Sequence, residues 1–192
     1  MAYWDSFGGR KSNMKLQTLQ VVKLSLFFLC SAFTGCIILA PVYQPSNTIK
    51  DLSGSVGILD NKDVTLHMVF PWNYIYAFGD VWCHQKSERS FFINGNQMPV
   101  CARCFGIFLG VPIGICFSIL SKTRIDKNIH KKFLIPLISG YSPLVVDEAG
   151  QLAGLWHSTN VLRILTGTFA GLAFGFILSI AMDIVNNALL TI

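Results

Sequence analysis

The sequence predicts an all-α integral membrane protein, built as a bundle of about four transmembrane helices. Hydrophobic residues make up 52% of the 192 residues, and charged residues make up only 13%. A soluble domain carries about 25% charged residues, and the mean hydropathy of +0.51 is high. Long apolar runs without charge complete the pattern. We therefore expect a multi-pass protein of the cell membrane, with the lipid bilayer as its main partner.

The formal net charge of +5 would also suit a protein that binds nucleic acid. The basic residues, however, fall mainly into two short runs beside apolar segments. That distribution is typical of the charges that orient a membrane protein. We expect no nucleic-acid partner.

Residues 24–43 form the first expected helix, because about 20 uncharged residues can cross a hydrocarbon core of about 30 Å. Its length, and the absence of a small-residue cleavage site, favour a retained helix over a signal peptide. Residues 1–23 then form a flank, and residues 44–103 form a long loop. Within that loop, residues 64–82 carry Trp and Tyr side chains that suit the headgroup layer, and the sequence assigns residues 44–82 no role.

Three further helices are expected at residues 104–120, 133–156 and 161–185. Together with the first helix they form a single transmembrane domain over residues 24–185. Residues 186–192 then form a short tail.

Lysine and arginine predict the orientation of this bundle. They concentrate before the first helix and between the second and third helices, whereas the other two connections carry little net positive charge. Cytoplasmic loops carry an excess of Lys and Arg, so both termini are expected in the cytoplasm and the long loop outside. The basic residues of the two cytoplasmic flanks are Arg10, Lys11, Lys15, Lys23, Lys122, Arg124, Lys127, Lys131 and Lys132.

Cysteines in the outer loop predict a metal site. Cys101 and Cys104 have the spacing that places two sulfurs on one ion, and Cys83 with His84 could complete a tetrahedral set. Zinc is the expected ion for thiolate and imidazole ligands. Neighbouring side chains point apart, so His84 could instead support a ligand. A redox pair is the alternative, because thiols outside the cytoplasm tend to become disulfides; thiols without a joint role are a third possibility.

A polar pocket is expected beside the cysteines. Asp147 and Gln151 are four residues apart and share a helix face. A carboxylate in the outer leaflet needs a partner, and Arg163 is the expected one, with Arg103 and Asn160 completing the pocket. The alternative is that Arg163 extends to the membrane surface while Asp147 is solvated.

Two glycine ridges predict which helices touch. The second and fourth helices each carry glycine at every fourth position, which lets parallel helix backbones approach closely. We expect these two helices to pack together. The residues of the two ridges are Gly106, Gly110 and Gly114, and Gly167, Gly171 and Gly175.

Two longer motifs extend over residues 83–167. The first reads Cys83-His84-Gln85, Arg89-Ser90-Phe91-Phe92, Gln97 and Pro99-Val100-Cys101-Ala102-Arg103-Cys104; the second reads Asp147-x-x-x-Gln151 and Ser158-x-Asn160-x-x-Arg163-x-x-Thr166-Gly167. These motifs closely resemble domain-of-unknown-function family 2085, a family of prokaryotic membrane proteins. The resemblance implies a membrane location and one shared site, and it implies no reaction. Phe105 and Glu148 depart from the family pattern, which has threonine and glycine at these positions.

Three functions are compatible with these patterns. The leading one is a membrane protein with a thiolate-bound zinc ion at the outer interface, next to the polar pocket; thiol-redox chemistry is its alternative. A transporter or channel subunit would use Asp147 and Arg163 on a solute path and would require a homo-oligomer. An assembly partner would use the cysteine loop for docking. The sequence leaves open whether the protein is an enzyme.

Overall fold

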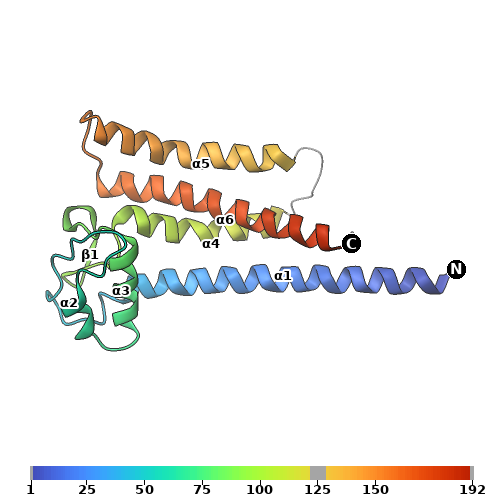
Figure 1. Cartoon of the computed structure of the whole chain (residues 1–192), viewed down its shortest axis with the longest axis horizontal. Helices are drawn as coiled ribbons and strands as arrows, with labels where there is room; N and C mark the ends of the chain where they lie inside the picture. Colours follow the sequence, from blue (N-terminus) through green and yellow to red (C-terminus); the bar gives the residue numbers. More distant parts are fainter. Residues whose placement is uncertain (1, 122–128, 191–192) are drawn as a thin grey trace.

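The structure is a computed structural model that describes residues 2–121 and 129–190 (Figure 1). Within these ranges the chain is mostly helical. Its elements are α1 (Ala2–Leu39), α2 (Lys62–Leu66), α3 (Trp72–Trp82), the 3-10 turn η1 (Ser87–Arg89), β1 (Phe92–Ile93), β2 (Asn96–Gln97), α4 (Ala102–Ser121), α5 (Ile129–Leu152) and α6 (Asn160–Leu190).

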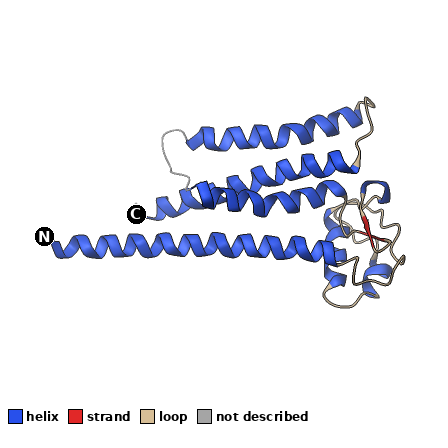
Figure 2. Cartoon of the chain, turned by 180° about the vertical axis from the view of Figure 1, so that it is seen from behind, coloured by secondary structure: helices blue, strands red, loops and turns tan. Residues whose placement is uncertain are grey.

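The four long helices run side by side, and a small cap formed by residues 40–101 covers one end of them (Figures 1 and 2). α1 begins, and α6 ends, at the opposite end of the bundle. Judged on length and composition alone, three segments of the described chain could cross a membrane. They are Gln17–Leu39, Ala102–Ser121 and Asn160–Ala188. The fourth long helix, α5, lies alongside α6. It contains two prolines, Pro136 and Pro143.

Two helices extend beyond the expected segments. α1 continues back to Ala2, so residues 2–23, which were expected as a flank, are helical and continuous with the first apolar segment. α6 continues to Leu190, through most of the expected tail. Neither extension contains proline, so nothing in the backbone stops a helix that has already formed.

α5 ends earlier than expected, at Leu152 rather than Trp156. Gly154 adopts a left-handed conformation with φ of +69°. The N–H of Leu155 donates to the carbonyl O of Gly150 (2.9 Å), and the N–H of Gly154 donates to that of Gln151 (3.1 Å). This is a Schellman motif, which terminates a helix and reverses the chain.

α4 and α6 pack backbone against backbone along the two glycine ridges. A Cβ added at Gly110 would lie 2.6 Å from the backbone N of Leu172, and one added at Gly114 would lie 2.8 Å from that of Phe176. Glycines of α6 face α4 in the same way: an added Cβ at Gly175 would lie 3.0 Å from the carbonyl C of Val111. Only glycine permits this approach, so the ridges fix the pair at the centre of the bundle.

A proline in α4 explains how α1 is attached. Pro112 has no N–H, so the carbonyl O of Phe108 lacks its helical donor. The hydroxyl of Thr34 in α1 donates to this carbonyl at 2.8 Å. Nearer the middle of α1, Lys23 pairs with Asp183 of α6 at 2.6 Å, and both side chains are largely buried. Polar contacts therefore hold α1 to α4 and to α6 at two places along its length.

Replacing Thr34 by valine tests the first of these contacts. Valine keeps the shape of threonine and leaves the Phe108 carbonyl without a donor, so we expect a loss of about 1 kcal/mol in unfolding free energy. Unfolding in detergent, followed by circular dichroism, measures it. Thr34→Ser retains the hydroxyl and should lose less than Thr34→Val. A valine variant as stable as the wild type would show that the carbonyl is satisfied otherwise.

Buried amides organise the cap, which has little regular structure. The side chain of Asn96 accepts from the N–H groups of Thr48 and Ile49 (2.9 and 3.0 Å). Gln97 accepts from the N–H of Leu52 at 3.2 Å, and Gln85 donates to the carbonyl O of Pro99 at 2.6 Å. All three amides are essentially inaccessible to solvent. They replace missing ladder hydrogen bonds and so fix the path of the chain on both sides of the cysteines.

Candidate metal centre and adjoining polar pocket

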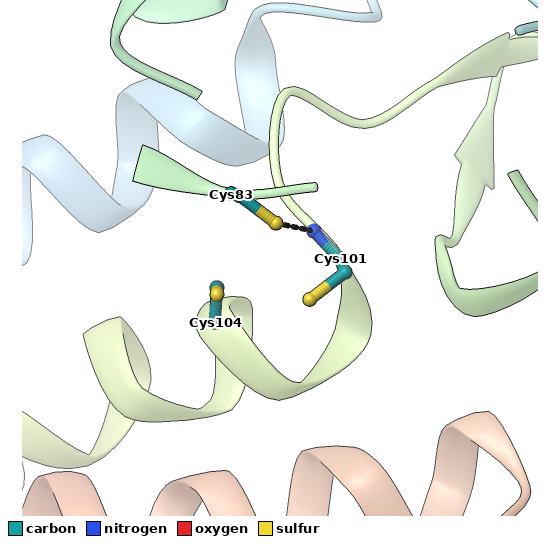
Figure 3. Close-up of side chains that lie close together, drawn as sticks. All are labelled: Cys83, Cys101 and Cys104. Carbon is teal, nitrogen blue, oxygen red and sulfur yellow. Dashed lines mark hydrogen bonds between the residues drawn. The ribbon is translucent and has the colours of Figure 1, made fainter. Parts of the chain in front are cut away.

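Three cysteines meet where the cap joins α4. Cys83 follows α3, Cys101 immediately precedes α4, and Cys104 lies in the first turn of α4. Figure 3 shows their sulfur atoms directed toward a common space. The three Sγ atoms lie within 4.8 Å of one another, and all three cysteines are free thiols. Among the described residues, this is the group of side chains placed to share one metal ion.

Backbone N–H groups point at the sulfur of Cys83. The N–H of Cys101 donates to this Sγ at 3.3 Å (Figure 3), and the N–H of Gln85 does so at 3.5 Å. Such donors stabilise a thiolate more than a thiol. The cap fixes this geometry, because the Gln85 amide binds the carbonyl of Pro99.

The three thiols differ in acidity. Hydrogen bonds from the thiols of Cys104 and Cys83 hold the pKa of Cys101 well below its ordinary value. The hydrogen bond to Cys101 is also the main reason why the pKa of Cys83 is raised. Cys101 also lies at the start of α4, where the helix dipole favours a thiolate. A thiolate is the form that binds a soft metal or attacks a disulfide.

His84 lies apart from the three sulfurs. Its side chain is exposed, and its Nδ1 lies 3.3 Å from the carbonyl O of Gly54. The structure thus gathers three of the four predicted ligands. His84 points elsewhere because the extended backbone at Cys83 sends consecutive side chains in opposite directions.

The polar pocket centres on the buried carboxylate of Asp147, of which only 3% is exposed. Arg103 forms an ion pair with it. Gln151 and Ser158 donate to its Oδ2 (3.1 and 3.0 Å), and the indole of Trp156 donates to Oδ1 (3.3 Å). Asp147 is therefore a fixed structural anion, held by donors from α4, α5 and the connection to α6.

Arg163 reaches this anion indirectly. It donates to the side-chain oxygens of Gln151 (3.2 Å) and Asn160 (3.0 Å). Asn160 in turn donates to the carbonyl O of Ser90 in the cap (3.2 Å). The five predicted pocket residues therefore form one continuous network. Its direct ion pair to Asp147 comes from Arg103 rather than from the expected Arg163, and Arg103 also pairs with Glu148.

A cavity of about 200 Å³ lies between the cysteines and this network. Most of its charged wall is positive. We call it the cationic cavity; its lining includes Cys83, Cys101 and Cys104 together with Lys86, Arg89, Arg103, Glu148 and Arg163. The two candidate features of the sequence thus share one space.

Sequence reasoning missed several residues of this site. Trp156 and Ser158 reach Asp147 because the chain reverses at Gly154, and the ring of Trp156 packs over Gly150. Gly154 followed by an apolar residue is a recognised helix stop and could have revealed this return. Ser90 belonged to the first motif, but no local pattern indicates that its carbonyl binds Asn160.

Comparison with known proteins places these features within a shared region. The family model described as "Predicted membrane protein (DUF2085)" matches residues 83–177, which contain the cysteines, the pocket and both glycine ridges. An uncharacterized protein of Methanocaldococcus jannaschii is 43% identical over 109 residues, covering 55% of this chain and 69% of the relative. An uncharacterized protein of Methanothermobacter thermautotrophicus is 32% identical over 103 residues, covering 54% of this chain and 89% of the relative. No solved structure matches the chain.

Proposed function

This chain belongs to the DUF2085 family of predicted membrane proteins, and from that premise we propose that it carries one zinc ion on Cys83, Cys101 and Cys104. The ion would lie at the outer end of a four-helix transmembrane bundle. The observation that supports the proposal is that three free thiols lie within 4.8 Å of one another, although Cys83 is far in the sequence from Cys101 and Cys104.

The donor set suits zinc. Soft thiolates select zinc or copper(I) over hard ions, and zinc is the common choice for a tetrahedral sulfur site. The N–H groups directed at Cys83 are the kind of outer contact that orients metal ligands. Three protein ligands leave the fourth position to water or to a substrate atom, an arrangement typical of catalytic rather than structural zinc. The cationic cavity borders the three cysteines.

The path of the chain supports four crossings. α4 ends away from the cap and α6 begins beside it, so the chain must return along the bundle between them (Figure 1). α5 provides that return: its 24 residues extend about 36 Å, which exceeds a hydrocarbon core of about 30 Å. Its large exposed apolar side chains would face lipid; they are Leu134, Ile135, Leu137, Ile138, Val145, Val146 and Leu152.

The basic flanks favour an outer location for the cap. α1 begins at the end opposite the cap, and α5 also begins there, with Lys131 and Lys132 in its first turn. Lys122, Arg124 and Lys127 lie outside the described residues. Because positive flanks stay in the cytoplasm, this end would be cytoplasmic, and the cysteines would face outward.

Metal analysis of the full chain in detergent tests the zinc site. We expect about one zinc per chain, lost in Cys101→Ser and in Cys83→Ser. Cys116→Ser, within α4 and away from the cluster, is the matched control and should retain zinc. Size-exclusion chromatography of each variant separates loss of metal from loss of fold. A folded wild-type protein that binds no zinc would exclude the proposal.

Thiol-redox chemistry is the second candidate, favoured by the lowered pKa of Cys101 within a Cys-x-x-Cys pair. In that case the protein would carry a Cys101–Cys104 disulfide, and alkylation before and after reduction would differ by two thiols. With bound zinc, a chelator alone should expose the thiols. The transport alternative gains less support, because four donors immobilise the Asp147 carboxylate.

A further inference from the structure

The cationic cavity contains a buried guanidinium that forms no ion pair with a carboxylate of the described residues. Arg163 is only 7% exposed. Its side-chain hydrogen bonds go to the neutral amide oxygens of Gln151 and Asn160, and its Nε has no partner among the described residues. Burial of an unpaired charge costs several kcal/mol. A bound anion is the partner that such a side chain requires.

The remaining charges of the wall do not supply this anion. Four cationic side chains line the cavity, and Glu148 is its one carboxylate among the described residues. Glu148 and the neighbouring Asp147 both pair with Arg103. Arg103 also has an unpartnered, buried Nε. The lining therefore carries more positive than negative charge, with Arg89 also lying 3.8 Å from the exposed carboxylate of Glu88. An excess of guanidinium and ammonium groups favours an oxyanion as the ligand.

An apolar groove of about 360 Å³ lies on the other side of the cysteines. Its walls come from α3 and α4. The residues that line it include Phe78, Trp82, Val100, Ile107 and Phe108, with Cys83 and Cys104. Four residues line both spaces, namely Trp82, Cys83, Cys104 and Ile107. The groove and the cavity are thus neighbours across two of the sulfurs.

From this juxtaposition we propose that the site binds a membrane lipid with a phosphate monoester headgroup. The phosphate would occupy the cationic cavity, and one hydrocarbon chain would occupy the apolar groove. A phosphate monoester carries a charge of about −1.5 to −2 at pH 7, which is opposite in sign to the charge of the cavity lining. A zwitterionic headgroup would place its own cation among the arginines, and a free anion would leave the groove unused.

The proposal deepens the proposed function by naming its ligand class, and it rests on that function only in sharing the cysteines. Zinc with three thiolates is still net negative, and the surplus of arginine and lysine offsets its repulsion of a phosphate. Lipid binding that persists in zinc-free protein would leave the lipid proposal standing while the zinc proposal fails. Zinc content and lipid binding are therefore measured on the same sample.

Three probes test the proposal with the full chain in maltoside detergent: dioctanoyl phosphatidic acid, inorganic phosphate and dioctanoylglycerol. We expect the phosphatidic acid to raise the unfolding temperature at concentrations at least about 100-fold lower than inorganic phosphate, because the groove adds apolar burial. Dioctanoylglycerol should have no effect. Equal action of inorganic phosphate would identify a free anion as the ligand and overturn the lipid proposal, as would an equal effect of dioctanoylglycerol.

Variants of the wall provide the second arm. Arg163 belongs to the network and its loss could prevent folding, so Arg89, whose side chain is 40% exposed, is the residue to change. Arg89→Gln should weaken phosphatidic acid binding about tenfold, the value of one charge-assisted contact. Lys50→Gln removes an exposed cation of the cap outside the cavity and should leave affinity unchanged. Equal affinity of Arg89→Gln and wild type would exclude phosphate binding at this wall.

Discussion

Alanine at Gly110 is expected to lower the free energy of unfolding by about 3 kcal/mol, the upper end of the cost of overpacking. The added methyl would lie 2.6 Å from the backbone N of Leu172 and 3.0 Å from the carbonyl C of Gly171. These are backbone atoms, so no side chain can rotate away, and the two helices must move apart. Leucine at both Gly110 and Gly171 should abolish the fold.

Gly35→Ala is the matched control for this change. Gly35 also lies in a helix long and apolar enough to span a membrane, α1, but a Cβ there would meet nothing within 4 Å. Alanine should therefore raise stability by up to about 1 kcal/mol through helix propensity. Thermal unfolding in detergent, monitored by circular dichroism and chromatography, compares the two variants. Similar behaviour of Gly110→Ala and Gly35→Ala would mean that α4 and α6 do not approach through their glycines.

The glycine ridges illustrate what local pattern can predict. Glycine at every fourth position specifies a smooth helix face without reference to the rest of the chain, and in the structure the two such faces meet. The long apolar runs and the low content of charged residues likewise predict a helical membrane protein without reference to tertiary structure. The two-residue spacing of Cys101 and Cys104 predicts that these two sulfurs lie close together, but no spacing predicts that Cys83 joins them.

The partner of Asp147 illustrates what local pattern cannot predict. The sequence predicts Arg163 as the counter-ion, because the two residues are expected at one end of neighbouring helices. The direct partner is Arg103, from the first turn of α4. Its position depends on the register in which α4 packs against α6. That register is set by the glycine contacts and by the cap, both of which are tertiary features. The structural roles of the Gln85 and Asn96 amides cannot be predicted from hydrophobic periodicity either, because these amides form hydrogen bonds with irregular backbone.

The second large effect is expected at Asp147, where Asp147→Asn should cost about 3 kcal/mol or more. The substitution leaves Arg103 partly buried with only Glu148 to pair with, and breaking a buried ion pair by removing one partner costs about 3–5 kcal/mol. Asparagine also turns one acceptor into a donor beside Ser158 and Gln151, whose hydrogens already point at Oδ2. The defect should be visible as a lower unfolding temperature in detergent and as altered Trp156 fluorescence.

Glu148 provides a matched control in the adjacent position. Its side chain is 41% exposed and also contacts Arg103. An ion pair that is accessible to solvent contributes about 1 kcal/mol or less, so Glu148→Gln should change stability little. The two variants remove the same charge within one helical turn and differ mainly in burial. If Glu148→Gln were the more damaging change, Arg103 would depend on the exposed acid. The exposed carboxylate of Glu148, rather than the buried carboxylate of Asp147, would then be the main stabilising partner in the pocket.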